Sequence, residues 1–291
     1  MQPSTFSIVA YDPQEDAFGV GVASKFLAVG AVVPWSRARV GAVATQALGK
    51  MSFGPDGLAL METGHNAAET LRMLLEGDPA REHRQVGLVD IHGGAAAHTG
   101  MDCLPFAGHL IGEGFTCQGN ILAGARVLEA MVAAYQAASG ELADRLLAAL
   151  QAGDDAGGDR RGKQSAAVLV TRPNGGYGGD NDRYMDLRVD DDPDPIPRLA
   201  VMIRAHHVFF GTPRREDQMP ITPDIARELQ AMMRAQGYFR GEVSGIWDAA
   251  SMQAFWTLVG SENLEERWHI DQHPDQVDRQ ALDYLRQRFP R

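Results

Sequence analysis

The sequence predicts an α+β fold in which two antiparallel sheets pack face to face, helices cover the outside of each sheet, and a small all-helical domain follows. The first observation is the element order, which runs strands, a helix pair, strands, a second helix pair and strands. The second is that the helices come in pairs, whereas parallel βαβ units need single helices between strands. The third is a polar, proline-flanked stretch at residues 211–220, beyond which only helical patterns occur.

The chain begins with strands. Thr5–Ala10 and Ala17–Ser24 are apolar, β-branched or glycine-containing, and they flank the turn-forming segment Asp12–Asp16. This pattern predicts a hairpin. Val40–Ala47 is expected to be a third strand, and Ala28–Val33 an additional one.

Two helices are expected next, at Pro55–Thr63 and Ala67–Glu76. Proline suits the first turn of the first helix, and Gly64 suits its end. Two glycine-containing turns then separate four short apolar segments. They predict two hairpins, Gln85–Ile91 with Ala95–Thr99 and Ala107–Ile111 with Phe115–Gln118.

Asn120 is expected to cap a long helix, because apolar residues follow it at helical spacing, and the pattern continues in a second helix after Gly140. Ser165–Thr171 and Tyr184–Val189 are expected to be the closing strands. Ile196–Phe210 is expected to be a helix that leaves the domain.

The last part of the chain is expected to be a separate unit. Gly211–Pro220 is the best linker candidate, and three helical patterns follow it, at Pro223–Gln236, Ala249–Gly260 and Val277–Arg288. The sequence therefore predicts a mixed domain over residues 1–213 and a three-helix domain over residues 214–291.

Composition restricts the functional classes. With 291 residues, 44% of them apolar and 22% charged, the chain has the composition of a globular protein. Its formal net charge of −11 disfavours nucleic acid as a partner. The apolar run Phe26–Trp35 is too short to span a bilayer, and the first twenty residues lack the pattern of a secretory signal. The expected location is the cytoplasm, with Cys103 and Cys117 as reduced thiols.

No cofactor and no metal are expected. Gly157–Gln164 matches the start of a phosphate-binding loop, but Gln164 replaces the Ser or Thr, and the expected order is helix, loop, strand, whereas phosphate loops lie between a strand and a helix. Asp90 and His92 would lie on the opposite strand face from His98, so the three would not converge on a metal. The aspartates between residues 180 and 194 lack calcium-loop spacing and suit a solvated acidic rim.

Thr5 is the candidate nucleophile. The chain has no Gly-x-Ser-x-Gly motif, which is the common serine-hydrolase signature. A threonine hydroxyl attacks a carbonyl when its own free α-amine acts as the base, and the pKa of that amine is about 7.7–8.0 in model peptides. The structural alternative is an ordinary residue at the start of a strand.

Several segments together resemble a known family across about residues 5–210. They include TFSIVAYDPQEDAFGVGVASKFLAVGAVVPW, GAVATQA, FGPDGLALM, RQVGLVD, QGNILAG, GGDRRGKQSAAVLV and DLRVDDDPDP. The chain is similar in these segments to domain-of-unknown-function family 1028, whose fold is assigned to the N-terminal nucleophile hydrolases. The resemblance implies a four-layer αββα sandwich, and it implies that Thr5 occupies the nucleophile position.

The start of the chain departs from this family. Relatives often begin Met-Thr, whereas here Met1–Ser4 would have to leave by cleavage of the Ser4–Thr5 bond. In threonine-type members of the superfamily, a strand lysine lowers the pKa of the nucleophile. The resemblance therefore makes Lys25 the candidate for this role.

The last third resembles small three-helix peptidoglycan-binding modules. Leu229-Gln230, Gly237-Tyr238-Phe239 and Gly245-Ile246-Trp247-Asp248 carry the likeness, although Ser244 and Asp248 differ from the usual Asp and Gly. The resemblance implies a cell-wall fragment as partner. The aromatic residues are expected to form mainly the core of this small domain.

Two functions from different classes follow. The first is an amide hydrolase acting on a small peptide or a muropeptide, with Thr5 as nucleophile and base and Lys25 as electrostatic helper. The alternative is a non-catalytic binding or scaffold protein with the same fold. The sequence sets neither the substrate nor the oligomeric state, and a homo-oligomer is one option.

Overall fold

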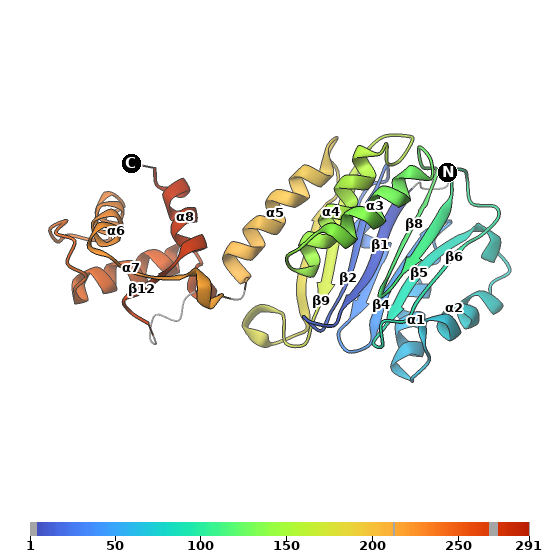
Figure 1. Cartoon of the computed structure of the whole chain (residues 1–291), viewed down its shortest axis with the longest axis horizontal. Coiled ribbons are helices and arrows are strands. Elements are labelled where there is room, and N and C mark those ends of the chain that lie inside the picture. Colours follow the sequence, from blue (N-terminus) through green and yellow to red (C-terminus); the bar gives the residue numbers. More distant parts are fainter. Residues whose placement is uncertain (1–4, 212, 268–272, 291) are drawn as a thin grey trace. The chain divides into compact units, whose positions relative to one another are not determined.

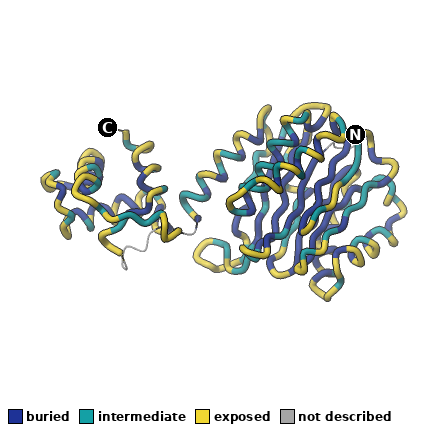
Figure 2. The backbone as a smooth tube through the Cα atoms, in the orientation of Figure 1, coloured by how far each residue is buried: buried dark blue, intermediate teal, exposed yellow. Residues whose placement is uncertain are grey.

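The computed structural model describes residues 5–211, 213–267 and 273–290 of the chain. The leader Met1–Ser4, on which the processing prediction depends, lies outside the described residues. The chain forms two compact units, Met1–Ile203 and Arg204–Arg291. Each unit has its own hydrophobic core, which Figure 2 shows as buried segments within an exposed surface.

The larger sheet of the first unit has six antiparallel strands in the order β10-β9-β2-β1-β8-β7. Their bounds are β1 Thr5–Asp12, β2 Ala17–Ser24, β7 Gly108–Gly112, β8 Phe115–Asn120, β9 Ser165–Thr171 and β10 Arg183–Val189. The predicted hairpin of β1 and β2 lies in the middle of this sheet (Figure 1). The register places Thr5 beside Ser24 on one side and Asn120 on the other.

The smaller sheet has four antiparallel strands in the order β3-β4-β5-β6. Their bounds are β3 Pro34–Arg37, β4 Gly41–Ala47, β5 Arg84–Asp90 and β6 Ala95–Thr99. The strand expected at Ala28–Val33 is wrong, since this segment contains a 3₁₀ turn at Val29–Ala31. The reason is that Ala28 is left-handed, with φ of +53°, which breaks an extended path.

Alternating side chains fill the space on both sides of the larger sheet. Phe6 and Ile8 of β1 pack outward against α3 (Arg126–Ala137) and α4 (Leu142–Asp155). Val9 points the other way, into a cluster that contains Ala42 of β4. The two sheets therefore pack face to face.

Helices also cover the outer face of the smaller sheet. These are α1 (Phe53–Glu62) and α2 (Ala67–Glu76), which pack on Val43 and Leu88. Both helices lie where the sequence predicts them. The structure is thus a mixed α/β unit with helix pairs outside two sheets.

The prediction that a helix starts at Asn120 is wrong. Asn120 is the last residue of β8, and α3 starts only at Arg126. The physical reason is tertiary: Asn120 pairs with Thr5 in the sheet and its Nδ2 donates to Gln85 Oε1 at 2.9 Å. Ile121 then turns the chain with φ of +51°.

The second unit is mainly helical. It contains α6 (Pro223–Ala235), α7 (Ala249–Ser261) and α8 (Arg279–Arg288), preceded by the C-terminal part of α5 (Pro195–Phe210). The three-helix prediction fits, but a two-stranded sheet of β11 (Gln218–Pro220) and β12 (Gln276–Asp278) was not predicted. The stretch expected to be a linker, Gly211–Pro220, therefore belongs to this unit. Among the described residues, no helix is long and apolar enough to cross a membrane.

A buried ion pair organises this unit. Arg267 Nε donates to Asp278 Oδ1 at 2.9 Å, and the two side chains are 2% and 0% exposed. Arg267 Nη1 also donates to the carbonyl oxygen of His207 at 2.7 Å, while Asp278 Oδ1 accepts from Ala281 N at the start of α8. These contacts connect the C-terminal part of α5 with β12 and the start of α8, and they provide the partners that buried charges need.

The aromatic residues of the second unit differ in burial. Phe239 and Phe255 are in the core, whereas Tyr238 is exposed. Trp247 is half-buried and lies edge-on to Phe255, with ring centroids 5.5 Å apart, and its Nε1 donates to the carbonyl oxygen of Pro274 at 3.0 Å. The indole of Trp247 is therefore a structural contact of this unit.

Candidate functional site

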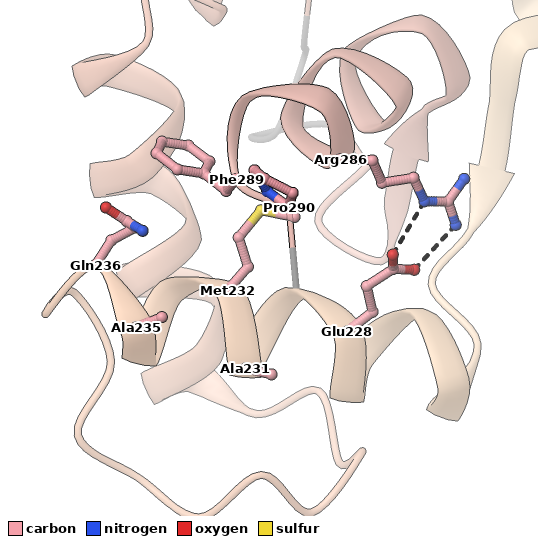
Figure 3. A pocket seen from close by; sticks show the side chains of 8 residues that line it. All are labelled: Glu228, Ala231, Met232, Ala235, Gln236, Arg286, Phe289 and Pro290. Carbon is pink, nitrogen blue, oxygen red and sulfur yellow. Dashed lines mark hydrogen bonds and ion pairs between the residues drawn. The ribbon is translucent and has the colours of Figure 1, made fainter.

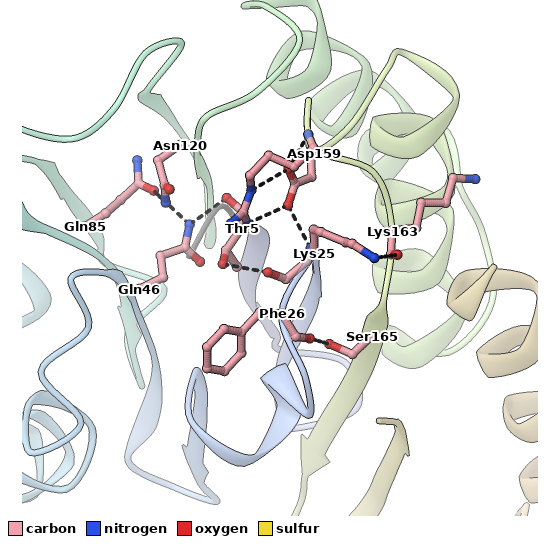
Figure 4. A network of polar contacts seen from close by, with 11 residues as sticks. Thr5, Lys25, Phe26, Gln46, Gln85, Asn120, Asp159, Lys163 and Ser165 are labelled. Atoms are coloured by element: carbon pink, nitrogen blue, oxygen red, sulfur yellow. Dashed lines mark hydrogen bonds and ion pairs between the residues drawn. The ribbon is translucent and has the colours of Figure 1, made fainter. Parts of the chain in front are cut away.

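Thr5 lies at the start of a central strand and lines a pocket. It is the first residue of β1 and one of the residues that line a pocket of about 220 Å³. Its Oγ1 is 3.2 Å from Ser24 Oγ on the neighbouring strand β2 (Figure 4). The residue is 1% exposed overall, so the hydroxyl is held inside the protein by its strand neighbours.

The walls of this pocket are predominantly apolar. Besides Thr5 they come from the segment after β2 and from the end of β4 and the loop beyond it. They are Phe26, Val29, Val32, Val33, Thr45, Gln46, Ala47, Gly49 and Met51. None of these described lining residues is charged.

Gln46 connects the pocket to a buried set of amides between the sheets. Its Nε2 lies 3.3 Å from the carbonyl oxygen of Thr5 and donates to Gln85 Oε1 at 2.8 Å. Its Oε1 accepts from Ser7 Oγ at 2.7 Å. The Gln46 side chain, on β4 of the smaller sheet, therefore contacts the backbone of Thr5 in the larger sheet.

The other amides of this set are also satisfied. Gln85 Nε2 donates to the carbonyl oxygen of Gly119 at 2.8 Å, and Gln85 Oε1 accepts from Asn120. Gln118 Nε2 donates to Ser7 Oγ at 2.7 Å. Buried amides with this many partners rigidify the region between the sheets.

Gly87 provides the space for these amides. A Cβ at this position would lie 2.2 Å from Gln118 Oε1 and 2.5 Å from Thr116 Oγ1. Thr116 Oγ1 itself donates to Gln118 Oε1 at 2.8 Å. The sequence needs glycine here because polar side chains of the opposite sheet approach the strand backbone.

Strained backbone surrounds the Thr5 end of the sheets. Ala28, Ala47 and Ile121 have φ of +53°, +63° and +51°. Ala47 lines the pocket, Ala28 precedes the lining residue Val29, and Ile121 follows the strand partner of Thr5. Left-handed alanine or isoleucine costs of order 1 kcal/mol each, and such residues tend to gather at functional sites.

Lys25 is close to Thr5 in the fold, but its ammonium group points elsewhere. Lys25 Nζ donates to the carbonyl oxygen of Lys163 at 3.3 Å, while its backbone N–H donates to Asp159 Oδ2 at 2.7 Å. Asp159 also accepts from Arg161 Nη2 at 3.0 Å. The Lys25 ammonium thus contacts the loop before β9, and the Lys25 backbone contacts Asp159 in the same loop.

Lys163 is part of an ion-pair cluster. The loop Gly157–Gln164 lies between α4 and β9, in the helix, loop, strand order that the sequence predicts. Lys163 Nζ is 2.6 Å from Asp154 Oδ2 and 3.1 Å from Asp194 Oδ1. The hydrogen bond with Asp154 is the main cause that raises the pKa of Lys163. The Lys163 ammonium therefore stays charged and is paired with carboxylates of the protein.

The other residues considered as metal ligands or reactive thiols have contacts that stabilise the fold. Asp90 accepts backbone hydrogen bonds from Ala67, His92 and Gly94, so it organises the β5–β6 turn and the start of α2. Burial raises the pKa of the Cys117 thiol, which is fully buried. Within residues 5–211, 213–267 and 273–290, no group of three His, Cys, Asp or Glu side chains could hold a metal ion.

The second unit has a pocket of its own, of about 510 Å³. It lies between α6 and the end of the chain after α8, with Met232 and Phe289 on its apolar side (Figure 3). Arg286 Nε and Nη2 donate to the two carboxylate oxygens of Glu228 at 3.0 and 2.9 Å. This paired hydrogen bond raises the pKa of Arg286 and gives the pocket a polar edge.

Comparison with known proteins identifies the family. The model of a family described as "Family of unknown function (DUF1028)" matches residues 5–199, which is most of the first unit and includes Thr5. The chain belongs to this DUF1028 family. The resemblance predicted from the sequence segments is therefore confirmed.

A solved structure supports the same assignment. Eighteen chains of solved structures match, among them the crystal structure of protein SPO2555 from Silicibacter pomeroyi, described as DUF1028. It is 30% identical, with a TM-score of 0.65, over 72% of this chain and 91% of that one. Residues 209–285 match a second family, described as "Putative peptidoglycan binding domain". Among curated proteins, none matches the chain.

The sequence analysis missed the polar residues that surround Thr5. These are Ser7, Ser24, Gln46, Gln85, Gln118 and Asn120, all buried. A signal was present, since Gln46, Gln85 and Gln118 each lie within a predicted strand, and glutamine is rarely fully buried without partners.

Proposed function

We propose that the DUF1028 unit is an N-terminal nucleophile hydrolase with a four-layer αββα sandwich, and that it cleaves an amide bond in a small peptide. The observation that carries the proposal is the position of Thr5. Thr5 lines a pocket at the start of a central strand, and the amide of Gln46 contacts its carbonyl oxygen. A nucleophile needs this kind of fixed surroundings to meet a bound carbonyl.

The first step of the proposal frees the α-amine of Thr5. Thr5 Oγ1 attacks the carbonyl carbon of Ser4, and the hydroxyl proton passes to the Thr5 nitrogen as the amide bond breaks. Residues 1–4 are then held as an ester until water releases them as a carboxylic acid and restores the hydroxyl. The product begins with Thr5.

The same groups then act on the substrate. The neutral α-amine takes the hydroxyl proton as Oγ1 attacks, and it gives a proton to the leaving nitrogen; water hydrolyses the acyl ester. Because the reference pKa of this amine is about 7.7–8.0, the rate is expected to rise with pH through this range. In this proposal the electrostatic role falls to groups other than the Lys25 ammonium, because Lys25 Nζ donates to the carbonyl oxygen of Lys163 at 3.3 Å.

For the second unit we propose binding of a cell-wall fragment, which would bring substrate to the first unit. The match to the peptidoglycan-binding family and the pocket between α6 and α8 support this. Titration with purified muropeptides tests it. Arg286→Ala is expected to weaken binding at least fivefold, and Arg240→Ala, outside the pocket, to leave it unchanged. Equal binding by both variants would contradict the proposal.

A non-catalytic binding protein is the alternative, and the position of the Lys25 ammonium favours it. Hydrolysis of a panel of N-acyl amino acid 4-nitroanilides separates the two functions. The hydrolase proposal predicts turnover that Thr5→Ala abolishes and that Thr63→Ala, on the exposed end of α1, preserves. Turnover by neither wild type nor variants on any panel member would support the alternative.

A further inference from the structure

We infer that the pocket beside Thr5 selects substrates whose scissile carbonyl carries a single uncharged apolar group, such as a leucine or phenylalanine side chain. The inference rests on the proposed function for its reaction, but the binding preference follows from the pocket itself. It concerns the acyl substituent, because Thr5 shares the pocket wall and Oγ1 must approach the carbonyl carbon to about 3–3.5 Å.

The chemistry of the wall argues for an apolar occupant. Val29 and Val33 form its inner part and are 1% and 3% exposed, while Phe26 and Met51 are 38% and 52% exposed and form its outer part. These four side chains are two branched aliphatic groups, one ring and one flexible thioether. A group that enters between them loses contact with water and gains apolar contacts.

The polar side-chain atoms of Thr45 and Gln46 in the wall are already engaged. Thr45 Oγ1 donates to the carbonyl oxygen of Lys50 at 3.2 Å. The Gln46 amide contacts Thr5, Ser7 and Gln85. A polar substituent would therefore lose its hydration without an equivalent partner among these two side chains.

None of the described lining residues is charged, and two charged residues nearby, Asp159 and Lys163, have ion-pair partners. Asp159 is paired with Arg161, and Lys163 with Asp154 and Asp194. A carboxylate or ammonium substituent would thus enter a pocket whose described walls contain no counter-ion. Acidic and basic substituents are therefore both expected to be poorer than apolar ones.

The size of the pocket limits the occupant to one group. Its volume of about 220 Å³ is below the range of about 300–1,000 Å³ that holds drug-sized ligands. One aliphatic or aromatic side chain fits this space, whereas a disaccharide does not. The sugar part of any cell-wall fragment would have to lie outside this pocket.

The test compares N-acetyl 4-nitroanilides of Leu, Phe, Ala, Asp and Lys by kcat/KM. The Leu and Phe substrates are expected to exceed the Ala substrate at least tenfold, and the Asp and Lys substrates to fall at least tenfold below it. Met51→Lys is expected to raise the ratio of Asp to Leu substrate at least tenfold. Met101→Lys, which is 91% exposed and outside the pocket, is the charge-matched control.

A second pair of variants tests the ring in the wall. Phe26→Ala is expected to lower kcat/KM for the Leu and Phe substrates at least fivefold, and Leu27→Ala, its exposed neighbour, to leave it unchanged. Equal rates for the Ala, Leu and Asp substrates would overturn the inference while the hydrolase function stood.

A binding measurement that does not depend on turnover distinguishes failure of the inference from failure of the hydrolase proposal. In calorimetric titrations of the full chain, N-acetyl-leucinamide is expected to bind at least tenfold more tightly than N-acetyl-aspartamide. This preference in a protein that hydrolyses nothing would support the inference and contradict the hydrolase proposal. Absence of the preference, with Leu and Asp substrates cleaved equally well, would contradict the inference alone.

Discussion

Replacement of Gln46 by leucine tests the structural importance of the buried amides. Gln46 is 2% exposed and makes two short side-chain hydrogen bonds, to Ser7 Oγ at 2.7 Å and to Gln85 Oε1 at 2.8 Å. Leucine has a similar size and no polar atom. The substitution therefore removes hydrogen bonds with little change of volume.

The expected cost can be worked out from the partners left behind. Ser7 Oγ loses its acceptor, and an unsatisfied buried group costs about 1–3 kcal/mol. Gln85 Oε1 keeps the hydrogen bond from Asn120, so the second loss is about 1 kcal/mol. The free energy of unfolding of the first unit is expected to fall by about 2–4 kcal/mol. For a unit of this size, that lowers the Tm by roughly 4–16 °C.

Differential scanning calorimetry, with hydrogen exchange of β1 and β4 peptides to assign the transition, measures this change. Gln14→Leu, in the exposed β1–β2 turn, is the control. Gln46→Glu adds a check of sign: burial raises the pKa of the new carboxyl, so the stability deficit of this variant against wild type is expected to shrink as pH falls from 8 to 5. A Gln46→Leu Tm within 1 °C of the control would refute this reasoning.

Three further changes are expected to act at separate places. Gly87→Ala puts a methyl group 2.2 Å from Gln118 Oε1 and is expected to cost about 1–3 kcal/mol, seen as faster hydrogen exchange in β8; unchanged exchange would contradict this. The hydrogen bond from Arg84 lowers the pKa of Asp78, so this pair stabilises the fold above the ordinary carboxyl pKa, and the contribution is lost as pH falls through the lower, folded-state value. Asp78→Asn is therefore expected to cost about 1.5–3 kcal/mol at pH 7 and less at pH 2.5 in urea titrations; an equal cost at both pH values would count against it. Trp247→Ala is expected to destabilise the second unit by about 3 kcal/mol, without moving the calorimetric transition of the first; a variant with an unchanged second transition would show that Trp247 is not structural.

Regular periodicity made the main elements predictable. The β1–β2 hairpin and helices α1 and α2 lie where alternating or helical apolar patterns predict them. The errors occur where single residues take left-handed conformations, at Ala28 and Ile121, because such conformations in non-glycine residues depend on tertiary contacts. The three-residue strands β11 and β12 are too short to produce a pattern.

The candidate site was predictable only in part. Thr5 was found from the chemistry of an N-terminal hydroxyl and from the family segments. The direction of the Lys25 ammonium and the partners of Gln46 depend on which strands meet across the sheets, and local sequence does not report this. The same is true of Gln85: its hydrogen bonds with Asn120 and Gln46 cannot be predicted from local sequence.

The N-terminal residue of the protein tests the central claim most directly. Intact-protein mass, followed over days of incubation and combined with N-terminal sequencing, reports whether the Ser4–Thr5 bond is cleaved. The proposal predicts loss of Met1-Gln2-Pro3-Ser4 and a new N-terminus at Thr5 in wild type, and retention of these residues in Thr5→Ala. Wild-type protein that retains Ser4 throughout and still hydrolyses no amide would contradict the assignment of Thr5 as nucleophile.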